Sequence, residues 1–471
     1  MPERKVVKRK PSLIESLVPI IAMLIFLGVG YGGFRMRIEI LLIAAAFVAG
    51  IISLRLGYSW KDMESGVVES IAKGMPAMLI LISVGMMISS WIASGTIPMM
   101  IYYGMKIISP RAFLVTSCIL CSLISFATGT SWGTAGTMGV ALMGIAKGLG
   151  IPEPAAAGSI VAGSFFGDKL SPFSDTTNLA PIAAKSNIFD HIKHMLWTTT
   201  PAWILGLVVY LILGIGYGQG SSTSSQMNLI MGAIKENFNF NIFLLIPPIL
   251  IIYFAVAKKP TIPGMIISSG IASLLALIFQ KMSLVKVVDI LTNGYKLKSG
   301  ISVVDNLLSR GGLMGMMGVT LIAFCAFSFA GIVKKAGMLD VILFHLLRFT
   351  RTTRTLITST VFSGILVALI TGSSYLTIII PGELFAPAFS RMKLAAKNLS
   401  RTTEDSGTVI VPLVPWSMAG VFMAGTLGVP TLKYIPWAIM NYTGFIFAII
   451  YGFTGFAIAP KIREDETQEG S

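Results

Sequence analysis

The sequence predicts an all-α polytopic membrane protein with an internal duplication. Of its 471 residues, 54% are hydrophobic and only 12% are charged, a balance that soluble domains do not have. Apolar runs long enough to cross about 30 Å of hydrocarbon recur along the whole chain. Two similar polar motifs interrupt these runs, one in each half of the sequence.

The apolar runs predict where the spanning helices lie. The first run follows basic residues, but it is about 20 residues long and lacks a clear cleavage site for a signal peptidase, so we expect a retained helix. The predicted spans cover residues 13–33, 38–55, 75–94, 196–217, 241–257, 262–280, 313–333, 354–370 and 434–457.

The charge distribution predicts the orientation and the division of the chain. Residues 1–12 are basic, and by the positive-inside rule this N-terminus lies in the cytoplasm. The net charge of +15 comes from basic residues scattered through short loops, which favours contact with anionic membrane lipid over nucleic acid. We expect a first membrane half at 13–217, a linking segment at 218–312 with helices, an amphipathic stretch and a polar loop around 216–228, a second half at 313–457 and a polar tail at 458–471.

Two short motifs show the duplication most clearly. ATGTSWGT at 127–134 and ITGSSYLT at 370–377 share a Thr, a Gly, a Ser and a second Thr at a constant offset of 243 residues. An acidic, polar segment follows each motif further along the chain. In secondary transporters, such paired interruptions mark discontinuous helices that meet near the bilayer midplane.

Each motif predicts the tip of a re-entrant hairpin. The apolar segments 111–126 and 135–148 are too short to cross the bilayer comfortably, and they meet at a cluster of Gly, Ser and Thr. Segments 354–370 and 375–390 repeat this pattern. Backbone that leaves helical geometry at membrane depth must be buried in protein or line a wet cavity, so such tips are natural ligand sites. The candidate tip residues are Gly129, Thr130, Ser131, Gly372, Ser373 and Ser374.

The first polar segment, GDKLSPFSDTTNLAP at 167–181, predicts a broken helix with an ion site. Two prolines bracket a run of carboxylate, hydroxyl and amide side chains, and the break frees main-chain carbonyls. Hard cations prefer oxygen ligands, and few acids at one site suggest a monovalent ion or a proton. The candidate ligands are Asp168, Asp175, Thr176, Thr177 and Asn178, with Asp175 the main one.

The second polar segment predicts another broken helix near 404–415, with a similar mixture of side chains. Four acids in the two segments would cost on the order of 10 kcal/mol if they were left unpaired in lipid, so we expect them to face a protein interior or a water path. A desolvated carboxylate can bind either H⁺ or Na⁺ but not both, and this competition is the minimal machinery of cation/proton exchange. The candidates here are Glu404, Asp405, Ser406 and Thr408.

Structural explanations for these acids remain open. Asp168 is followed by Lys169, so the two could form an ion pair or belong to a surface loop. Glu404 and Asp405 follow basic residues, including Arg401, and a salt bridge at a helix end could account for one of them.

An intramembrane hydrolase is the remote alternative. GTSWG at 129–133 matches the G-x-S-x-G pattern, but the match is weak in a chain with 48 glycines. His191, His194 and His345 form no convincing motif, and HIKH at 191–194 lacks the Glu and the spacing of H-E-x-x-H. We therefore expect no enzyme, no cofactor and no transition metal.

At these motifs the sequence resembles the NhaC-type Na⁺/H⁺ antiporters of the ion transporter superfamily. The matching segments are GTSWGT, GSIVAGSFFGDKLSPFSDTTNLAP and LSRTTEDSGTVIVPLVPWSMAGVFMAGTLGVP, within a resemblance that covers residues 70–457. It implies a multi-pass plasma-membrane protein of a prokaryote that exchanges Na⁺ for H⁺. The wider superfamily implies two inverted-topology repeats, each with a re-entrant hairpin and a broken transmembrane helix, an elevator-type motion and a homodimer.

The family also includes members that exchange malate and protons for lactate and Na⁺, so a Na⁺/H⁺-coupled organic-anion exchanger is the alternative function. A small carboxylic acid would need a cationic or helix N-terminal anchor near the midplane. Lys169 and Arg401 are the available cations.

These observations lead to one mechanistic hypothesis. Asp175 and one of Glu404 or Asp405 bind Na⁺ when ionised and H⁺ when Na⁺ leaves, while Asp168 couples or gates the exchange. Desolvation opposes movement of the empty, charged site across the membrane. The oxygen shell would be completed by Thr130, Ser131, Thr176, Thr177, Ser374 and Thr408.

Overall fold

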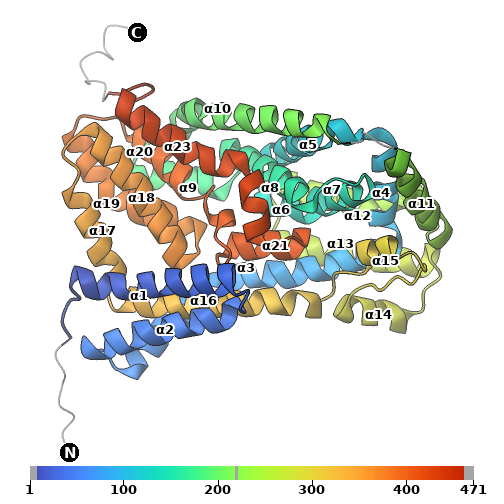
Figure 1. Ribbon diagram of the computed structural model, residues 1–471, viewed down its shortest axis with the longest axis horizontal. Coiled ribbons are helices and arrows are strands. Elements are labelled where there is room, and N and C mark those ends of the chain that lie inside the picture. The colour runs from blue at the N-terminus through green and yellow to red at the C-terminus, as the bar shows by residue number, and fades with distance from the viewer. Residues whose placement is uncertain (1–7, 218–220, 461–471) are drawn as a thin grey trace, which may run out of the picture.

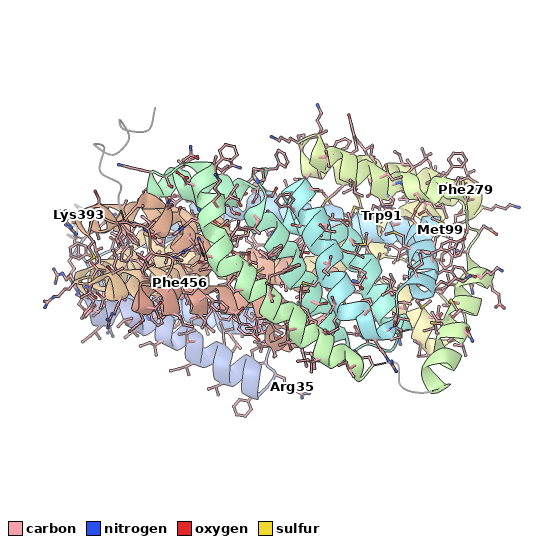
Figure 2. The ribbon with its side chains drawn as sticks, turned by 90° about the horizontal axis from the view of Figure 1, so that it is seen from above. Arg35, Trp91, Met99, Phe279, Lys393 and Phe456 are labelled. Carbon is pink, nitrogen blue, oxygen red and sulfur yellow. The ribbon has the colours of Figure 1, made fainter. Side chains whose placement is uncertain are left out.

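The computed structural model describes residues 8–217 and 221–460, and it is built from helices (Figure 1). Eight helices of the described residues are long and apolar enough to cross a membrane, or up to eleven if each of three bent pairs is one span. Lys393 lies at one end of the elongated molecule, and Met99 and Phe279 lie at the other (Figure 2). The all-helical, multi-spanning fold agrees with the prediction from composition.

One layer of the molecule is formed by α1, α2, α3 and α16, which lie side by side (Figure 1). The first helix starts at a capping box in which Ser12 and Glu15 exchange hydrogen bonds, and it continues as a π-helix over Phe26–Gly33. The layer consists of α1 (Leu13–Ile25), α2 (Ile38–Arg55), α3 (Trp60–Ser94) and α16 (Met317–Lys335).

The first hairpin and the first broken helix follow α3 in the chain. The helices of this part are α4 (Thr96–Ile107), α5 (Phe113–Thr128), α6 (Ser131–Thr134), α7 (Val140–Gly148), α8 (Glu153–Leu170), α9 (Asp175–Ala184) and α10 (Ile188–Ile215). A π-helical segment, Ala135–Gly139, joins α6 to α7 without a break. The hairpin therefore has one arm at α5 and a second, continuous arm from α6 to α7.

A linking segment separates this part from its counterpart in the second half. It contains α11 (Ser221–Asn237), α12 (Ile246–Val256), α13 (Thr261–Phe279), α14 (Leu284–Asn293) and α15 (Ser302–Leu308). The second half continues after α16 with α17 (Met338–Arg348), α18 (Thr353–Thr371), α19 (Ser374–Arg391), α20 (Ala396–Ser406), α21 (Met418–Leu427), α22 (Thr431–Tyr434) and α23 (Ile439–Thr454).

Several predicted boundaries differ from the structure. The polar loop expected around 216–228 is helical from Ser221. The predicted span 241–257 contains a 3₁₀ turn, Ile242–Leu245, and the short α12, and together these are bent by 108° from the helix before them. The first hairpin arm, expected to be too short at 111–126, extends over Pro110–Thr128 because a 3₁₀ turn lengthens it. At 19 residues it is long and apolar enough to cross a membrane. The predicted span 75–94 begins earlier, at Trp60, because a solvent-exposed polar extension precedes its apolar part.

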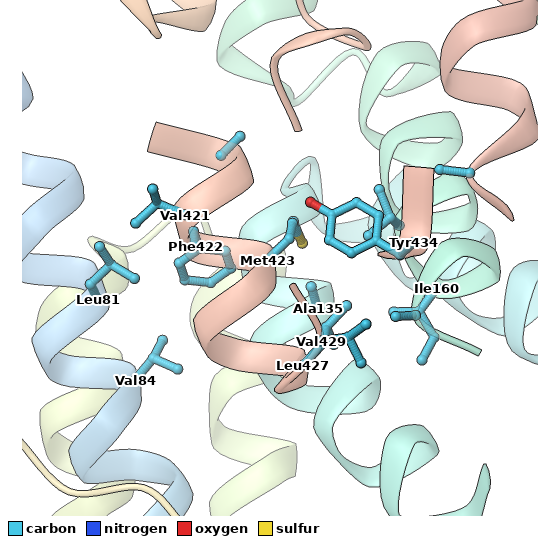
Figure 3. Close-up of a cluster of buried hydrophobic side chains, with 14 of the residues drawn as sticks. Leu81, Val84, Ala135, Ile160, Val421, Phe422, Met423, Leu427, Val429 and Tyr434 are labelled. Carbon is cyan, nitrogen blue, oxygen red and sulfur yellow. The ribbon is translucent and has the colours of Figure 1, made fainter. Parts of the chain in front are cut away.

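Helix α21 lies near the middle of the molecule (Figure 1), between α3 and the helices of the first hairpin (Figure 3). Val421 and Phe422 lie beside Leu81 and Val84 of α3, while Leu427 lies toward Ala135 (Figure 3). The Phe422 ring also stacks on that of Trp132 in α6, with the ring centroids 4.5 Å apart. The second half of the sequence therefore packs directly on the first hairpin.

Helices α5 and α8 approach closely because glycines face α5. A Cβ on Gly163 would lie 2.2 Å from the Cys118 carbonyl oxygen, and one on Gly167 would lie 2.2 Å from that of Ser122. Small residues that allow such backbone contact are typical of membrane helix pairs.

We predict that Gly167→Ala destabilises the protein, because backbone atoms of α5 occupy the space that the new methyl group needs. Overpacking of this kind costs about 1–3 kcal/mol, so the melting temperature in detergent falls. Gly270→Ala on α13 is the matched control, since nothing lies within 4 Å of a Cβ there. Equal melting temperatures for the two variants would contradict the packing described.

Candidate functional site

The two hairpin tips have the same backbone geometry. Helix α5 ends at Gly129 and helix α18 at Gly372, both left-handed, with φ of 68° and 61°. A hydroxyl then caps each following helix: Thr130 accepts from the Gly133 N–H and Ser373 from the Leu376 N–H. These glycines are required because other residues adopt positive φ at a cost.

Each tip packs against the break of the broken helix that follows it. A Cβ on Gly129 would lie 2.6 Å from the backbone of Phe173, in the first break. In the second half, the Met418 N–H donates to the Gly372 carbonyl at 3.1 Å. The tip and the break of each half therefore form one packed unit.

The first break spans residues 171–174, between α8 and α9, and its backbone is satisfied locally. The Thr177 hydroxyl donates to the carbonyl oxygens of Asp168 and Lys169, at 3.1 and 3.0 Å. The Asn178 amide donates to the carbonyls of Pro172 and Ser174, at 2.9 and 2.7 Å. The side chains of Thr177 and Asn178 therefore stabilise the backbone of the break, a role that the sequence did not indicate.

The two aspartates of this segment lie in different environments. Asp168 is 7% exposed, and its carboxylate accepts a hydrogen bond of 2.7 Å from Ser131 at the first tip. Asp175 begins α9 and is exposed, and Tyr375 of the second tip is 3.4 Å from its carboxylate. The acid favoured by the sequence thus lies at the surface of the site, and Asp168 lies within it.

The second break follows α20, where Glu404 and Asp405 are completely buried. The Ser406 hydroxyl donates to the Thr402 carbonyl within the same helix, at 2.7 Å. The Thr408 hydroxyl has no hydrogen-bond partner among the described residues. Ser417 caps the helix after the break by accepting from the Gly420 N–H at 2.9 Å.

An ion pair joins the two broken helices. Lys169, in the last turn of α8, is bonded to Asp405, in the last turn of α20, and both side chains are buried. Thr198 of α10 donates to the same carboxylate oxygen at 3.1 Å. Lys169 therefore forms its ion pair with an acid of the other half and not with its neighbour Asp168. This ion pair compensates the charge of Asp405, one of the two acids of α20.

Glu404 is the buried acid without a partner. Neither of its carboxylate oxygens has a hydrogen-bond partner among the described residues. Lys169 and Asp168 are the charged groups that act on it, and the hydroxyls of Thr408 and Thr176 lie near it, so its surroundings come from both broken helices. A buried carboxylate is expensive unless something compensates its charge, so this arrangement suits a bound cation or proton.

A cavity of about 610 Å³ gives access to this cluster. Residues of both halves line it, among them Ser131, Asp168, Thr176, Ser374 and Thr408. The other predicted residues that line it are Gly129, Thr130 and Asp175; those outside the lining are Thr177, Asn178, Gly372, Ser373, Glu404, Asp405 and Ser406. Three lysines, Lys73, Lys258 and Lys259, also line the cavity.

The two expected anchors for an organic anion differ in this structure. Lys169 is paired with Asp405. Arg401 is buried, and one guanidinium nitrogen donates to the Ala457 carbonyl at 2.8 Å, while Nε and Nη2 have no hydrogen-bond partner among the described residues. The histidines hold α10 to α20, with His191 bonded to Ser400 at 2.9 Å and His194 to Asn398 at 3.0 Å. Their polarity in an apolar helix was the only sequence signal for this contact.

Comparison with known proteins gives the family. The model of the Na⁺/H⁺ antiporter family matches residues 6–177 and 163–456, which is most of the chain. The chain belongs to this family. The resemblance to NhaC-type proteins is thereby confirmed, and the protein is a multi-pass membrane protein.

Three relatives match along almost their whole length. The chain is 46% identical over 457 residues to an uncharacterized Na⁺/H⁺ antiporter of Haemophilus influenzae, covering 96% of this chain and 98% of that protein. It is 36% identical over 432 residues to the Na⁺/H⁺ antiporter NhaC of Alkalihalophilus pseudofirmus, with coverages of 91% and 93%. It is also 35% identical over 448 residues to the malate-2H⁺/Na⁺-lactate antiporter of Bacillus subtilis, with coverages of 95% and 96%.

We predict that Lys169→Met destabilises the protein far more than Lys169→Met combined with Asp405→Leu. The single variant leaves an unpaired buried carboxylate, which costs about 3–5 kcal/mol, whereas removal of both charges is close to neutral. Melting temperatures of the two single variants and the double variant measure this coupling. Additive losses would show that the pair contributes no coupling between the broken helices.

Proposed function

We propose that the protein exchanges Na⁺ for H⁺ across the plasma membrane of a prokaryote, and that the two ions compete for Glu404 and Asp168. The observation that carries this proposal is the completely buried Glu404 carboxylate, which has no hydrogen-bond partner among the described residues. The named Na⁺/H⁺ antiporters among the relatives support the same exchange.

The chemistry of the cluster fits a small hard cation. Glu404 and Asp168 supply carboxylate oxygens, and Thr176 and Thr408 supply hydroxyl oxygens close to them. Na⁺ and H⁺ each compensate one carboxylate charge, so the binding of one lowers occupancy by the other. The ion pair removes Asp405 from this competition, because its charge is already compensated by Lys169.

In this proposal Asp175 attracts cations at the entrance and does not hold them. It is exposed and lines the cavity, whereas Asp168 and Glu404 are buried deeper. This assignment differs from the sequence-based hypothesis, in which Asp175 was the main ligand. Thr130, Ser131 and Ser374 remain candidates for a transient shell on the path to the site.

Alternating access through two inverted repeats is supported by the order and placement of the helices. Hairpin and broken helix occur twice in the same order, at α5 to α9 and at α18 to α21. Helices α4 to α7 lie toward one end of the molecule and α17 to α20 toward the other, so the hairpins approach from opposite ends (Figure 1). The packed tips and breaks would move together against the layer of α1, α2, α3 and α16, as in an elevator, within the homodimer that the resemblance implies.

In this proposal the cavity opens toward the cytoplasm. Lys258 and Lys259 line the cavity and precede α13, whose other end carries Phe279, so these lysines lie one helix length away from the Phe279 end of the molecule (Figure 2). The junction of α17 and α18, which carries Arg348, Arg351 and Arg354, lies at the end of the molecule away from α4 (Figure 1). By the positive-inside rule this end is cytoplasmic.

Organic-anion exchange is the second candidate. The malate-2H⁺/Na⁺-lactate antiporter among the relatives favours it, and Lys73, Lys258 and Lys259 could attract a carboxylate to the cavity. A hydrolase finds little support, because the serine of the G-x-S-x-G match bonds Asp168 and the two nearby histidines of α10 bond Ser400 and Asn398.

We predict that Glu404→Gln abolishes Na⁺-driven proton movement in proteoliposomes, because a neutral amide cannot exchange H⁺ for Na⁺. Glu383→Gln, an exposed acid outside the cavity lining, is the matched control and retains exchange. A pH-sensitive dye inside the vesicles measures the flux, with malate and lactate absent. Full flux in the Glu404 variant would overturn the assignment, and flux that needs an added carboxylic acid would favour the organic-anion exchanger.

We predict that the Na⁺ concentration at half-maximal rate rises as the pH falls, by up to about tenfold per pH unit, because both ions use the same carboxylates. At saturating Na⁺ the inhibition by protons is relieved. The measurement is a set of Na⁺ titrations at several pH values in the same vesicles. Proton inhibition that saturating Na⁺ does not relieve would place the protonated group outside the site.

A further inference from the structure

A second polar cavity, of about 670 Å³, is lined by residues of α7 and α15 and by the segment that follows α14. Four cationic side chains line it, and no Asp or Glu does so within the part of the chain that the structure describes. The remaining polar lining consists of Asn293, Tyr295, Asn306 and Ser309. The four cations are Lys147, Lys296, Lys298 and Arg310. Such a lining selects an anion.

The segment after α14 is built to present two of these lysines. Tyr295 and Leu297 are buried, and their N–H groups donate to the Arg310 carbonyl and the Ser309 hydroxyl, at 3.2 and 3.0 Å. In an extended chain, alternate residues point to opposite sides. Lys296 and Lys298 are therefore both directed away from the core, and both line the cavity.

The charges of this region are only partly compensated. Lys147 pairs with Glu153 at 3.1 Å, and the Arg310 guanidinium donates to the Thr426 carbonyl at the end of α21. No salt bridge among the described residues includes Lys296 or Lys298. The cavity therefore keeps two free positive charges beside two that are already engaged.

Helix α14 places this cavity at the membrane surface. Its inner face buries Val287 and Ile290, yet Leu284, Val285 and Val288 are 65%, 80% and 54% exposed. A short helix with charged residues between exposed apolar ones is typical of a segment that lies in the interface, with its apolar side in the lipid. Its last residue, Asn293, lines the cavity, so the cavity opens at headgroup depth.

We propose that this cavity binds the headgroup phosphate of an anionic phospholipid, with the acyl chains on the exposed apolar side of α14 and the start of α16. Exposed Met317 and Leu321 provide the apolar surface on α16, and exposed Met314 extends it on the 3₁₀ turn before that helix. Basic pockets between membrane helices recognise anionic lipid through the same charge complementarity. Because Arg310 also holds the end of α21, the lipid stabilises the second broken helix at its outer end.

The test is lipid binding to the purified, delipidated protein in detergent, measured by native mass spectrometry with phosphatidylglycerol as the probe. Lys296→Gln combined with Lys298→Gln weakens this binding by at least about tenfold, since each lysine near an anionic lipid contributes about a factor of five. Lys281→Gln combined with Lys286→Gln removes the same charge nearby but outside the cavity lining, and it leaves binding within about twofold of the wild type. Unchanged melting temperatures without lipid show that all variants are folded.

Two further probes decide what the cavity recognises. Phosphatidylcholine carries the same phosphate with a compensating cation, so it binds more weakly than phosphatidylglycerol. Glycerol phosphate lacks acyl chains, and at the same concentration it fails to compete with the lipid. Competition by glycerol phosphate equal to that of phosphatidylglycerol would make a soluble anion the ligand and overturn the lipid assignment. Equal loss of binding in the two double variants would overturn the assignment to this cavity.

Discussion

The buried contact between Lys169 and Asp405 is the constraint on which the centre of the protein depends. A lysine and an aspartate at this depth each carry a desolvation cost of several kcal/mol, which only a partner of opposite charge offsets. Since one comes from each half of the sequence, neither broken helix can keep its last turn buried without the other. The two breaks are thus held side by side, and the hairpin tips that pack on them come together as a consequence.

The polar groups that surround this contact divide into those that are satisfied within the protein and those that are not. Thr177, Asn178 and Ser417 direct their side chains to the backbone of the breaks or caps. Several unpartnered acceptors of the described residues lie near the second break, at Glu404, Asp405, Thr408 and Asn441, and others, such as Ser164 and Thr358, lie elsewhere. Proteins rarely leave such groups unpaired, so their concentration in one place is itself a sign of an exchangeable ligand.

Much of this arrangement follows from local sequence. Composition predicts the all-helical membrane fold, and the two glycines with their neighbouring hydroxyls mark both tips within a residue or two. The polar segments likewise mark both breaks. What sequence could not supply is the partner of Lys169, 236 residues away, or the exposure of Asp175. Both depend on how the halves pack, and spacing along the chain carries no information about that distance.

The two adjacent charged residues at the end of each broken helix face different surroundings, because successive side chains on a helix are turned by about 100°. In α8 Asp168 meets the hairpin tip while Lys169 reaches the other half; in α20 Glu404 is left unpartnered while Asp405 takes the lysine. Deletion of a single residue upstream in either helix would turn both charged side chains by about 100° away from these positions, with almost no change in composition or hydropathy. Surface loops of this protein can vary in length, but the number of residues in α8 and α20 is fixed as firmly as the identity of the acids they carry.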